Sequence, residues 1–337
     1  MGSAADRPFA LLGFGSPIVD LISAVDDDFL AREIPGGKGG TLHVSADDMR
    51  ALIARLPSPP RLLAGGSAGN TVFALNRLGV RAVLLGKLCD DDRGRFFRSR
   101  MLAAGGSDEC LFPAPGEATA ACLVLSTPDG ERTMRSCLGA SLELTPADLD
   151  RVDFSAYDVL LAEGYMVDAP VFDEVFARAH TAGIKIAFDP GSFEIARAER
   201  GRFLAVLEKY ADIALFNRAE AAALLGDGSD AELLAGLSRR CPVAVLKLGG
   251  EGALIEVSGA GVWRIPAVPV GAPVDTTAAG DMFAAGFFYG MARRPGDWRF
   301  AGECGARLAA RVVRVMGAEL PGAAYDEIRE FGGRNRR

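Results

Sequence analysis

The sequence predicts an α/β fold in which a mostly parallel central sheet lies between layers of helices, with a small accessory β-sheet beside it. Three observations lead to this prediction. In the middle and C-terminal parts of the chain, short apolar or β-branched runs alternate with longer amphipathic stretches. Turn or polar residues follow three of those runs, at 189–191, Asn217 and 249–250. Residues 17–45 and 108–139 instead show alternating patterns and turns, which favour the accessory sheet.

The elements follow from these patterns. The expected strands are the apolar runs at residues 82–86, 158–162, 184–188, 212–216 and 243–248. The expected helices are the amphipathic stretches at residues 69–78, 93–104, 170–182, 199–209, 218–225, 230–239, 281–293 and 298–316. Residues 119–126 and 131–135 flank a Pro-Asp-Gly sequence at 128–130, which favours a hairpin.

These elements divide the chain into two parts. Residues 1–16, 46–107 and 140–337 are expected to form the α/β core. Residues 17–45 and 108–139 are expected to form the accessory sheet, inserted into the core and able to cover a cleft. Because ligands bind at the carboxyl ends of strands in such sheets, we expect the functional site at that edge of the core.

Composition narrows the function. The chain has 337 residues, 49% of them hydrophobic, which is enough for one large core and a small additional unit. With 37 Lys and Arg against 44 Asp and Glu residues, the formal net charge is -7, so no basic field attracts nucleic acid or an anionic membrane. The sequence has no long apolar run, and residues 1–8 lack a signal-peptide pattern. We therefore expect a cytoplasmic protein with a small-molecule partner.

Cysteine and histidine usage excludes several kinds of chemistry. The six cysteines show no C-x-x-C pair and no metal-ligand spacing, so they are expected to be reduced and mostly buried. His43 and His180 are the only histidines, which leaves little room for a histidine metal site or a Ser-His-Asp triad. Any catalysis must therefore depend on carboxylates and backbone dipoles.

The strongest motif is Asp275-Thr-Thr-Ala-Ala-Gly-Asp281, followed by an apolar run. Its small residues let the backbone approach a ligand closely. The helix that follows would direct the unpaired N–H groups of residues 278–281 at an anion. The motif therefore predicts a phosphate cradle with the Asp281 carboxylate at its edge. In the alternative interpretation, Asp281 only complements the helix dipole.

A second motif, Gly65-Gly-Ser-Ala-Gly-Asn70, opens the helix expected at 69–78. Glycines allow substrate hydroxyls to reach the main chain, and Asn70 offers both a donor and an acceptor to a diol. The alternative is a turn with an ordinary helix cap. The glycine cluster at 36–40 lacks a following apolar helix, and neither cluster has the Lys-Ser/Thr of a Walker A loop.

Two further motifs follow predicted strands. Asn217-Arg-Ala-Glu220 is suited either to hold Mg²⁺ through water, since Mg²⁺ keeps most of its hydration shell, or to cap a helix. Lys247-Leu-Gly-Gly-Glu-Gly252 is a glycine turn that either borders a nucleotide or serves only as a turn.

In this order, and together with Gly13-Phe-Gly-Ser-Pro-Ile-Val-Asp20, these motifs resemble the pfkB or ribokinase-like carbohydrate and nucleoside kinases over nearly the whole chain. The resemblance implies a three-layer αβα sandwich with a β lid, which we predict to close over the substrate. It also implies an enzyme that transfers the γ-phosphate of ATP to a hydroxyl group. Closure would exclude water, because ATP hydrolysis is the side reaction to avoid.

The resemblance assigns roles residue by residue. It implies that Asp281 is the catalytic base. The anion hole it implies is formed by the N–H groups of residues 278–281, including Ala278, Ala279 and Gly280. The substrate-binding residues it implies are Asp20, Gly65, Gly66 and Asn70. The ATP-binding residues it implies are Asn217, Lys247, Gly249, Gly252 and Cys304. Glu220 would organise Mg²⁺ through water, and Asp275 with Thr277 marks where some relatives hold a monovalent cation such as K⁺.

Three details are more similar to adenosine kinases than to ribokinase: the C-terminal stretch 301–321, the segment 131–134 and the segment 163–166. By that similarity Arg132 would bind phosphate, while Met134 and Tyr165 would sandwich a purine. The implied acceptor is the ribose 5′-hydroxyl of adenosine or a related nucleoside.

One departure and several alternatives remain. The family has glycine where this chain has Ala278, and alanine tolerates positive φ poorly, so a shifted anion hole is expected. The acceptor is alternatively a sugar, such as ribose, fructose or a keto-deoxy sugar acid. A third reading is a nucleotide- or sugar-binding sensor without turnover. The protein is either a monomer or a homodimer.

Overall fold

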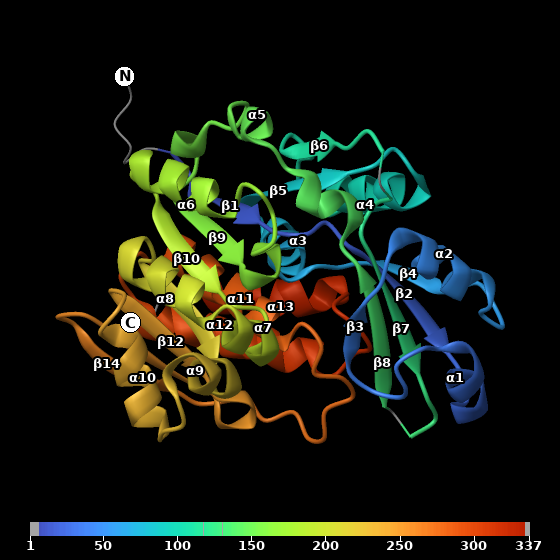
Figure 1. Ribbon diagram of the computed structural model, residues 1–337. Coiled ribbons are helices and arrows are strands. Elements are labelled where there is room, and N and C mark those ends of the chain that lie inside the picture. The colour runs from blue at the N-terminus through green and yellow to red at the C-terminus, as the bar shows by residue number, and fades with distance from the viewer. Residues whose placement is uncertain (1–6, 117, 130, 334–337) are drawn as a thin grey trace.

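The computed structural model describes residues 7–116, 118–129 and 131–333 and contains two β-sheets. Figure 1 shows the smaller sheet beside the larger one, which is surrounded by helices. The α/β fold with a mostly parallel sheet is confirmed. Among the described residues, no helix is both long enough and apolar enough to cross a bilayer. Residues 1–6, which belong to the start that lacks a signal-peptide pattern, lie outside the described residues. Gly130 of the expected hairpin turn also lies outside them.

Within the described ranges, the large sheet has nine strands in the order β14-β13-β12-β11-β10-β9-β1-β5-β6. Their bounds are β1 Ala10–Phe14, β5 Arg81–Leu88, β6 Leu111–Pro113, β9 Val159–Glu163, β10 Lys185–Asp189, β11 Ile213–Asn217, β12 Val243–Lys247, β13 Ala253–Val257 and β14 Gly261–Ile265. In this spatial order, the neighbouring strands β12, β11, β10, β9, β1, β5 and β6 pair in parallel. The strands β13 and β14 pair antiparallel. The chain leaves β1 towards β5 on one side and later returns to β9 on its other side. This reversal is the switch point where α/β sheets bind ligands.

Helices cover both faces of this sheet because side chains alternate along each strand. Leu11 belongs to one buried cluster and its neighbour Leu12 to the other. The helices packed on the Leu11 side are α3 (Ser67–Arg77), α4 (Asp92–Ala103), α11 (Ala279–Arg293), α12 (Trp298–Val312) and α13 (Gly322–Gly333). Those packed on the Leu12 side are α5 (Pro146–Leu149), α6 (Phe172–Thr181), α7 (Phe193–Ala198), α8 (Arg200–Lys209), α9 (Arg218–Leu225) and α10 (Asp230–Ser238). The three-layer arrangement follows from this alternation.

The small sheet has the order β3-β8-β7-β2-β4. Its strands are β2 Val19–Ala24, β3 Thr41–His43, β4 Arg61–Ala64, β7 Ala121–Ser126 and β8 Arg132–Cys137, and it carries the helices α1 (Asp27–Glu33) and α2 (Ala46–Ala54). The antiparallel β7–β8 hairpin is confirmed. We call the small sheet with α1 and α2 the lid.

The lid differs from the expected boundaries at two places. The strand β4 and the helix α2 belong to it, although residues 46–107 were expected in the core. β4 pairs with β2, and only Leu63 of its residues is buried, so the sequence gives it no clear strand pattern. Conversely, β6 pairs with β5 in the large sheet, because Leu111 and Phe112 are buried in the core.

All six cysteines are buried, as expected, and no disulfide joins any of them. Burial raises the pKa of Cys122 and of Cys304 to about 12, so these thiols stay protonated at neutral pH. The cysteines therefore act as apolar core residues and not as nucleophiles or ligands.

Candidate active site

The N-terminus of α11 carries the expected anion-binding motif. Ala278 is its N-cap residue, with φ of 59° and ψ of 11°. It is the one residue other than glycine with positive φ among the described residues. The Ala279 N–H donates to the Thr276 carbonyl oxygen at 3.2 Å. Within the described part of the chain, the N–H groups of Ala278, Gly280 and Asp281 form no hydrogen bond, so these three are available to an anion.

The expected catalytic carboxylate, Asp281, lies at the same helix terminus and is partly buried. The Ser67 hydroxyl donates to its Oδ1 at 2.7 Å, and the Asn70 side-chain amide donates to its Oδ2 at 2.8 Å. Burial raises the pKa of Asp281 to about 6, against the opposing effect of these two hydrogen bonds. A carboxylate with such a pKa is suited to accept a proton near neutral pH.

The glycine motif at 65–70 brings together the residues that were expected to bind the substrate. A Cβ atom at Gly66, where φ is 90°, would lie 2.2 Å from the Ser16 carbonyl oxygen. A Cβ at Gly65 would lie 2.6 Å from Oδ2 of Asp20. Only glycines therefore allow this close packing. The structure thus brings Asp20, Gly65, Gly66 and Asn70 to one place beside Asp281, as the sequence predicted.

Asp20 is affected electrostatically by the same site. Burial first, and then the negative charge of Asp281, raise its pKa to about 7, whereas Arg132 lowers it. The two carboxylates are therefore close enough to disfavour simultaneous ionisation in this state. A substrate hydroxyl donating to Asp20 would stabilise its charged form.

Sequence reasoning missed three residues of the site. Ser67, which orients Asp281, lies inside the glycine motif. Glu163 ends β9 and accepts hydrogen bonds from the N–H groups of Ser16 at 2.8 Å and Ala68 at 2.6 Å, which joins the loop after β1 to the first turn of α3. Asp189 ends β10 and pairs with Lys247 at 2.7 Å. An acidic residue at the end of an apolar strand was the available signal for the last two.

The motif at 217–220 forms a helix cap. Asn217 and Glu220 make a reciprocal capping box at the start of α9. Both Glu220 carboxylate oxygens accept hydrogen bonds from Asn217, at 2.7 Å and 2.6 Å. Burial raises the pKa of Glu220 to about 7. Within the described ranges, no group of three or more His, Cys, Asp or Glu residues could hold a metal ion. Glu220 thus suits contact with a metal's water shell better than direct ligation.

Arg132 does not stand free for phosphate in this conformation. Its guanidinium pairs with the Asp275 carboxylate at 2.5 Å and also contacts the Thr277 hydroxyl. Asp275 further accepts hydrogen bonds from the N–H groups of Thr277 at 2.9 Å and Gly317 at 2.7 Å. Arg132 therefore occupies the acidic position at which some relatives hold a monovalent cation, a question that the sequence left open.

Met134 and Tyr165, which were expected to sandwich a purine, come from the lid and from the core respectively. Met134 packs in a small lid cluster with Ile18, Ala120, Cys122 and Val124. The Tyr165 hydroxyl instead donates to the Gly191 carbonyl oxygen at 2.9 Å, which fixes the ring beside the carboxylates of the core. The sandwich of a purine between them stays a prediction.

Cys304 does not suit its expected role, because its side chain is 0% exposed in the core and cannot reach a nucleotide in this state. Of the two glycines expected near the nucleotide, Gly249 has open space where a Cβ would lie. At Gly252, a Cβ would lie 2.0 Å from the Ile265 carbonyl oxygen, so packing against β14 accounts for this glycine.

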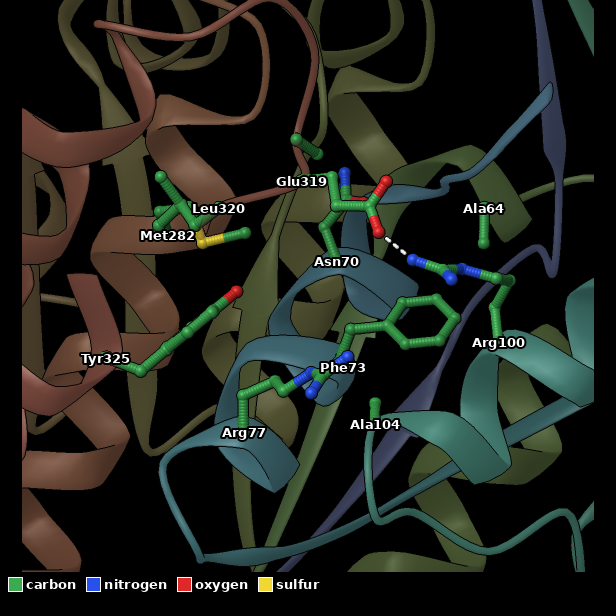
Figure 2. A pocket seen from close by; sticks show the side chains of 11 residues that line it. Ala64, Asn70, Phe73, Arg77, Arg100, Ala104, Met282, Glu319, Leu320 and Tyr325 are labelled. Carbon is green, nitrogen blue, oxygen red and sulfur yellow. Dashed lines mark ion pairs between the residues drawn. The ribbon is translucent and has the colours of Figure 1, made fainter. Parts of the chain in front are cut away.

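A pocket is lined in part by Asn70, the residue that donates a hydrogen bond to Asp281 (Figure 2). Its walls come from α3, α4, α11, α13 and the segment before α13, and they include Phe73, Met282 and Tyr325. An ion pair between Arg100 and Glu319 crosses it (Figure 2). Asn70 and Met282, the residue after Asp281, both line this pocket.

Comparison with known proteins shows to which family this chain is similar. Residues 54–323 match the model of the pfkB family carbohydrate kinases. This chain belongs to the pfkB family. It is therefore an ATP-dependent kinase of the carbohydrate and nucleoside type, and the expected family, fold and enzyme class are confirmed.

Individual pfkB relatives differ in what they phosphorylate. The chain is 31% identical to an ATP-dependent ribose-1-phosphate kinase of Halopiger xanaduensis, over 73% of this chain and 80% of that protein. It is 32% identical to the crystal structure of an adenosine kinase from Sinorhizobium meliloti, with a TM-score of 0.84 over 96% of this chain and 99% of the other. A probable sugar kinase from Rhizobium etli gives 29% identity and the same TM-score of 0.84, over 96% of this chain and 98% of the other.

Proposed function

We propose that this kinase transfers the γ-phosphoryl group of ATP to the ribose 5′-hydroxyl of adenosine or a related nucleoside. The observation that carries the proposal is the position of Asp281, fixed by Ser67 and Asn70 and close to Asp20. A carboxylate base beside a second, diol-binding carboxylate suits a ribose ring whose free primary hydroxyl points at the base. The 32% identity to an adenosine kinase over nearly the full chain favours the nucleoside.

In this proposal the residues of the chain divide the work of the reaction. Asp281 orients the acceptor hydroxyl and accepts its proton as the bond to phosphorus forms. The N–H groups of Ala278, Gly280 and Asp281 bind the oxygens of the transferring group. Phosphoryl transfer needs alignment and charge neutralisation more than covalent help, and these groups supply both.

Mg²⁺ fits this site only as an ion held mainly by phosphate oxygens and water. Glu220 uses both carboxylate oxygens in its cap, so it would contact the ion's water shell. When bound, Mg²⁺ would neutralise phosphate charge. A K⁺ ion beside Asp275 would have to displace Arg132, so we propose that turnover does not require K⁺. Equal turnover in potassium chloride and tetramethylammonium chloride is the expected result, and clear stimulation by K⁺ would overturn this point.

The lid, which takes residues from 17–64 and 118–137, is proposed to close over the acceptor and exclude water. Without an acceptor, the rate of ATP hydrolysis should stay far below the rate of transfer. Equal rates with and without acceptor would contradict closure.

A sugar is the second candidate acceptor, because the chain is 31% identical to a kinase of ribose 1-phosphate. The test is an ATP-to-ADP coupled assay with Mg²⁺ across adenosine, other nucleosides, ribose, ribose 1-phosphate, fructose and keto-deoxy gluconate. A kcat/KM at least about tenfold higher for a nucleoside than for any free sugar would support the proposal. The highest value for a sugar or sugar phosphate would refute it and leave the kinase assignment intact.

A further inference from the structure

Lys247 is largely shielded from solvent at the end of β12, beside the proposed catalytic motif. Its ammonium group lies 2.7 Å from Oδ2 of Asp189, and the two side chains are only 11% and 10% exposed. The other oxygen of Asp189 accepts a hydrogen bond from the Gly191 N–H at 2.9 Å. Since β11 lies between β10 and β12, the ion pair reaches across one strand at the carboxyl edge of the sheet. Both partners are therefore fixed before any ligand binds.

The same ammonium group lies directly against the anion-binding helix terminus. An ideal Cβ atom at Gly280 would be 3.2 Å from Nζ of Lys247. Gly280 is one of the residues whose N–H group is unengaged among the described residues. The ammonium and the positive end of the α11 dipole thus meet at one point, from the sheet and from the helix respectively. An anion at the helix terminus would lie within reach of both.

The hydrogen bonds of Lys247 are incomplete. A lysine ammonium group has three N–H donors, yet Asp189 is the single acceptor that it reaches in the described part of the chain. Lys87 provides a comparison, because it forms a similarly buried pair with Asp148 at 2.8 Å and also donates to the Glu143 carbonyl oxygen at 3.0 Å. Buried donors usually find partners. The unfilled donors of Lys247 therefore indicate an acceptor that arrives with a ligand.

Charge supports the same conclusion. Carboxylates from three elements face Lys247: Asp189 of β10, Glu220 of α9 and Asp281 of α11. Together they raise the pKa of Lys247 even though burial opposes this, so the side chain remains an ammonium at neutral pH. Three acids around one ammonium would repel a phosphate group unless a cation touched it directly. Lys247 is placed to be that cation.

We propose that Lys247 is a catalytic residue that binds an oxygen of the transferring phosphoryl group, and that Asp189 is the positioning residue that holds it. This inference rests on the kinase reaction and not on the identity of the acceptor. In the reaction, the acceptor oxygen forms a bond to the γ-phosphorus, and the bond from that phosphorus to the bridging oxygen breaks. The bonding electrons leave with ADP, and the acceptor proton goes to Asp281. Lys247 keeps its protons and neutralises charge on the moving group.

The first test compares Lys247→Met, Lys247→Arg and the control Lys87→Met. Removing one preorganised charge donor from the reacting group typically lowers kcat by about 10²- to 10³-fold. We expect that loss in Lys247→Met, a smaller change in KM for ATP, and partial recovery in Lys247→Arg. Lys87→Met removes an equally buried ion pair, so it should lower the melting temperature while kcat stays within about threefold. A kcat for Lys247→Met within threefold of wild type, or equal to that of Lys87→Met, would overturn the proposal.

The role of Asp189 is tested by measuring whether its substitution changes kcat or KM. Asp189→Asn keeps the shape but removes the charge that fixes the ammonium. We expect a lower kcat with nearly unchanged KM for the acceptor, and a smaller effect of Lys247→Met in the Asp189→Asn background. If the effects of the two substitutions simply add, Asp189 does not act through Lys247.

A second test needs neither turnover nor a stable Lys247→Met protein. Inorganic phosphate is added to wild-type protein carrying ¹³C-labelled lysine, with the Lys247 signal assigned from the folded Lys247→Arg variant. The Cε signal of Lys247 should shift with saturable phosphate dependence, while that of Lys87 should not move. No shift of the Lys247 signal at phosphate concentrations that saturate the protein would refute contact with the anion.

Discussion

Arg132 of the lid strand β8 lies 2.5 Å from the Asp275 carboxylate, on the core loop that leads into α11. Asp275 also accepts the N–H groups of Thr277 and Gly317, so its two oxygens join the lid, the anion-binding loop and the segment before α13. These contacts, with Arg132 as its largest stabilising partner, hold the pKa of Asp275 below its usual range. The position of the lid is therefore physically connected to the loop that is proposed to bind the transferring phosphoryl group.

Arg132→Met should loosen the lid. Without the guanidinium, the Asp275 carboxylate loses its lid partner, and we expect a rise of about tenfold in the acceptor KM together with a larger share of ATP hydrolysed without transfer. The ratio of ADP formed to phosphorylated product measures this share. Arg50→Met is the matched control, because Arg50 is a lid arginine whose ion pair with Asp47 is exposed. An unchanged ratio in Arg132→Met would show that the contact does not govern closure.

Asp281→Asn should lower kcat by about 10²- to 10⁴-fold, because the amide cannot accept the acceptor's proton. Binding of ATP, followed by calorimetry, should change little. Comparing this variant with wild type also distinguishes a kinase from a sensor, because a sensor would bind ATP without turnover in either form. A variant that turns over at the wild-type rate would mean that Asp281 is not the base.

The activity should depend on pH through this carboxylate. Burial raises the pKa of Asp281 to about 6, so kcat/KM should rise as the pH increases through about 6 and then level off. Glu163 and Glu220, each with a pKa raised by burial to about 7, and Asp20 are close by, so the measured value belongs to the group of carboxylates. A profile that is flat between pH 5 and 8 would contradict the assignment.

The raised pKa of Asp281 also makes the free energy of unfolding depend on pH. The folded pKa of Asp281, about 6, lies above its ordinary value of 3.8, so the folded state binds more protons in that interval. Its contribution to stability is therefore largest below the ordinary pKa and is lost as the pH rises through about 6. Asp281→Asn, which cannot ionise, should gain stability relative to wild type between about pH 4 and 7 in urea unfolding. A gain that shrinks over that interval would contradict this sign.

Ala278→Gly should relieve backbone strain. A left-handed conformation costs a residue with a Cβ about 1–2 kcal/mol, and the greater freedom of glycine in the unfolded chain offsets part of the gain. We expect an increase of up to about 1 kcal/mol in the free energy of unfolding, with a kcat at least equal to wild type. Ala279→Gly, one residue into the helix where φ is not positive, should instead destabilise the protein. Destabilisation by both substitutions would mean that Ala278 is not strained.

Much of the core could be predicted because its signals are local. The strands at 81–88, 159–163, 185–189, 213–217 and 243–247 lie within a few residues of the expected apolar runs. Strands of a parallel sheet are apolar throughout because helices cover both faces of the sheet. Leu11 and Leu12 illustrate this, since the two neighbours are buried on opposite faces. β4 escaped prediction because its place in the lid depends on pairing with β2, which no local pattern encodes.

The sequence by itself determined the glycine and aspartate motifs, and hence the family, the helix terminus proposed to bind an anion and the proposed base, Asp281. These depend on residue types at fixed short spacings, which act through the local backbone. Only the tertiary structure decided the partners of charged side chains. Lys247 meets Asp189 across β11, Arg132 meets Asp275 from the lid, and Cys304 turns into the core. Such pairings depend on how distant segments pack, and electrostatic contact forms wherever folding brings opposite charges together in a space that water cannot fill.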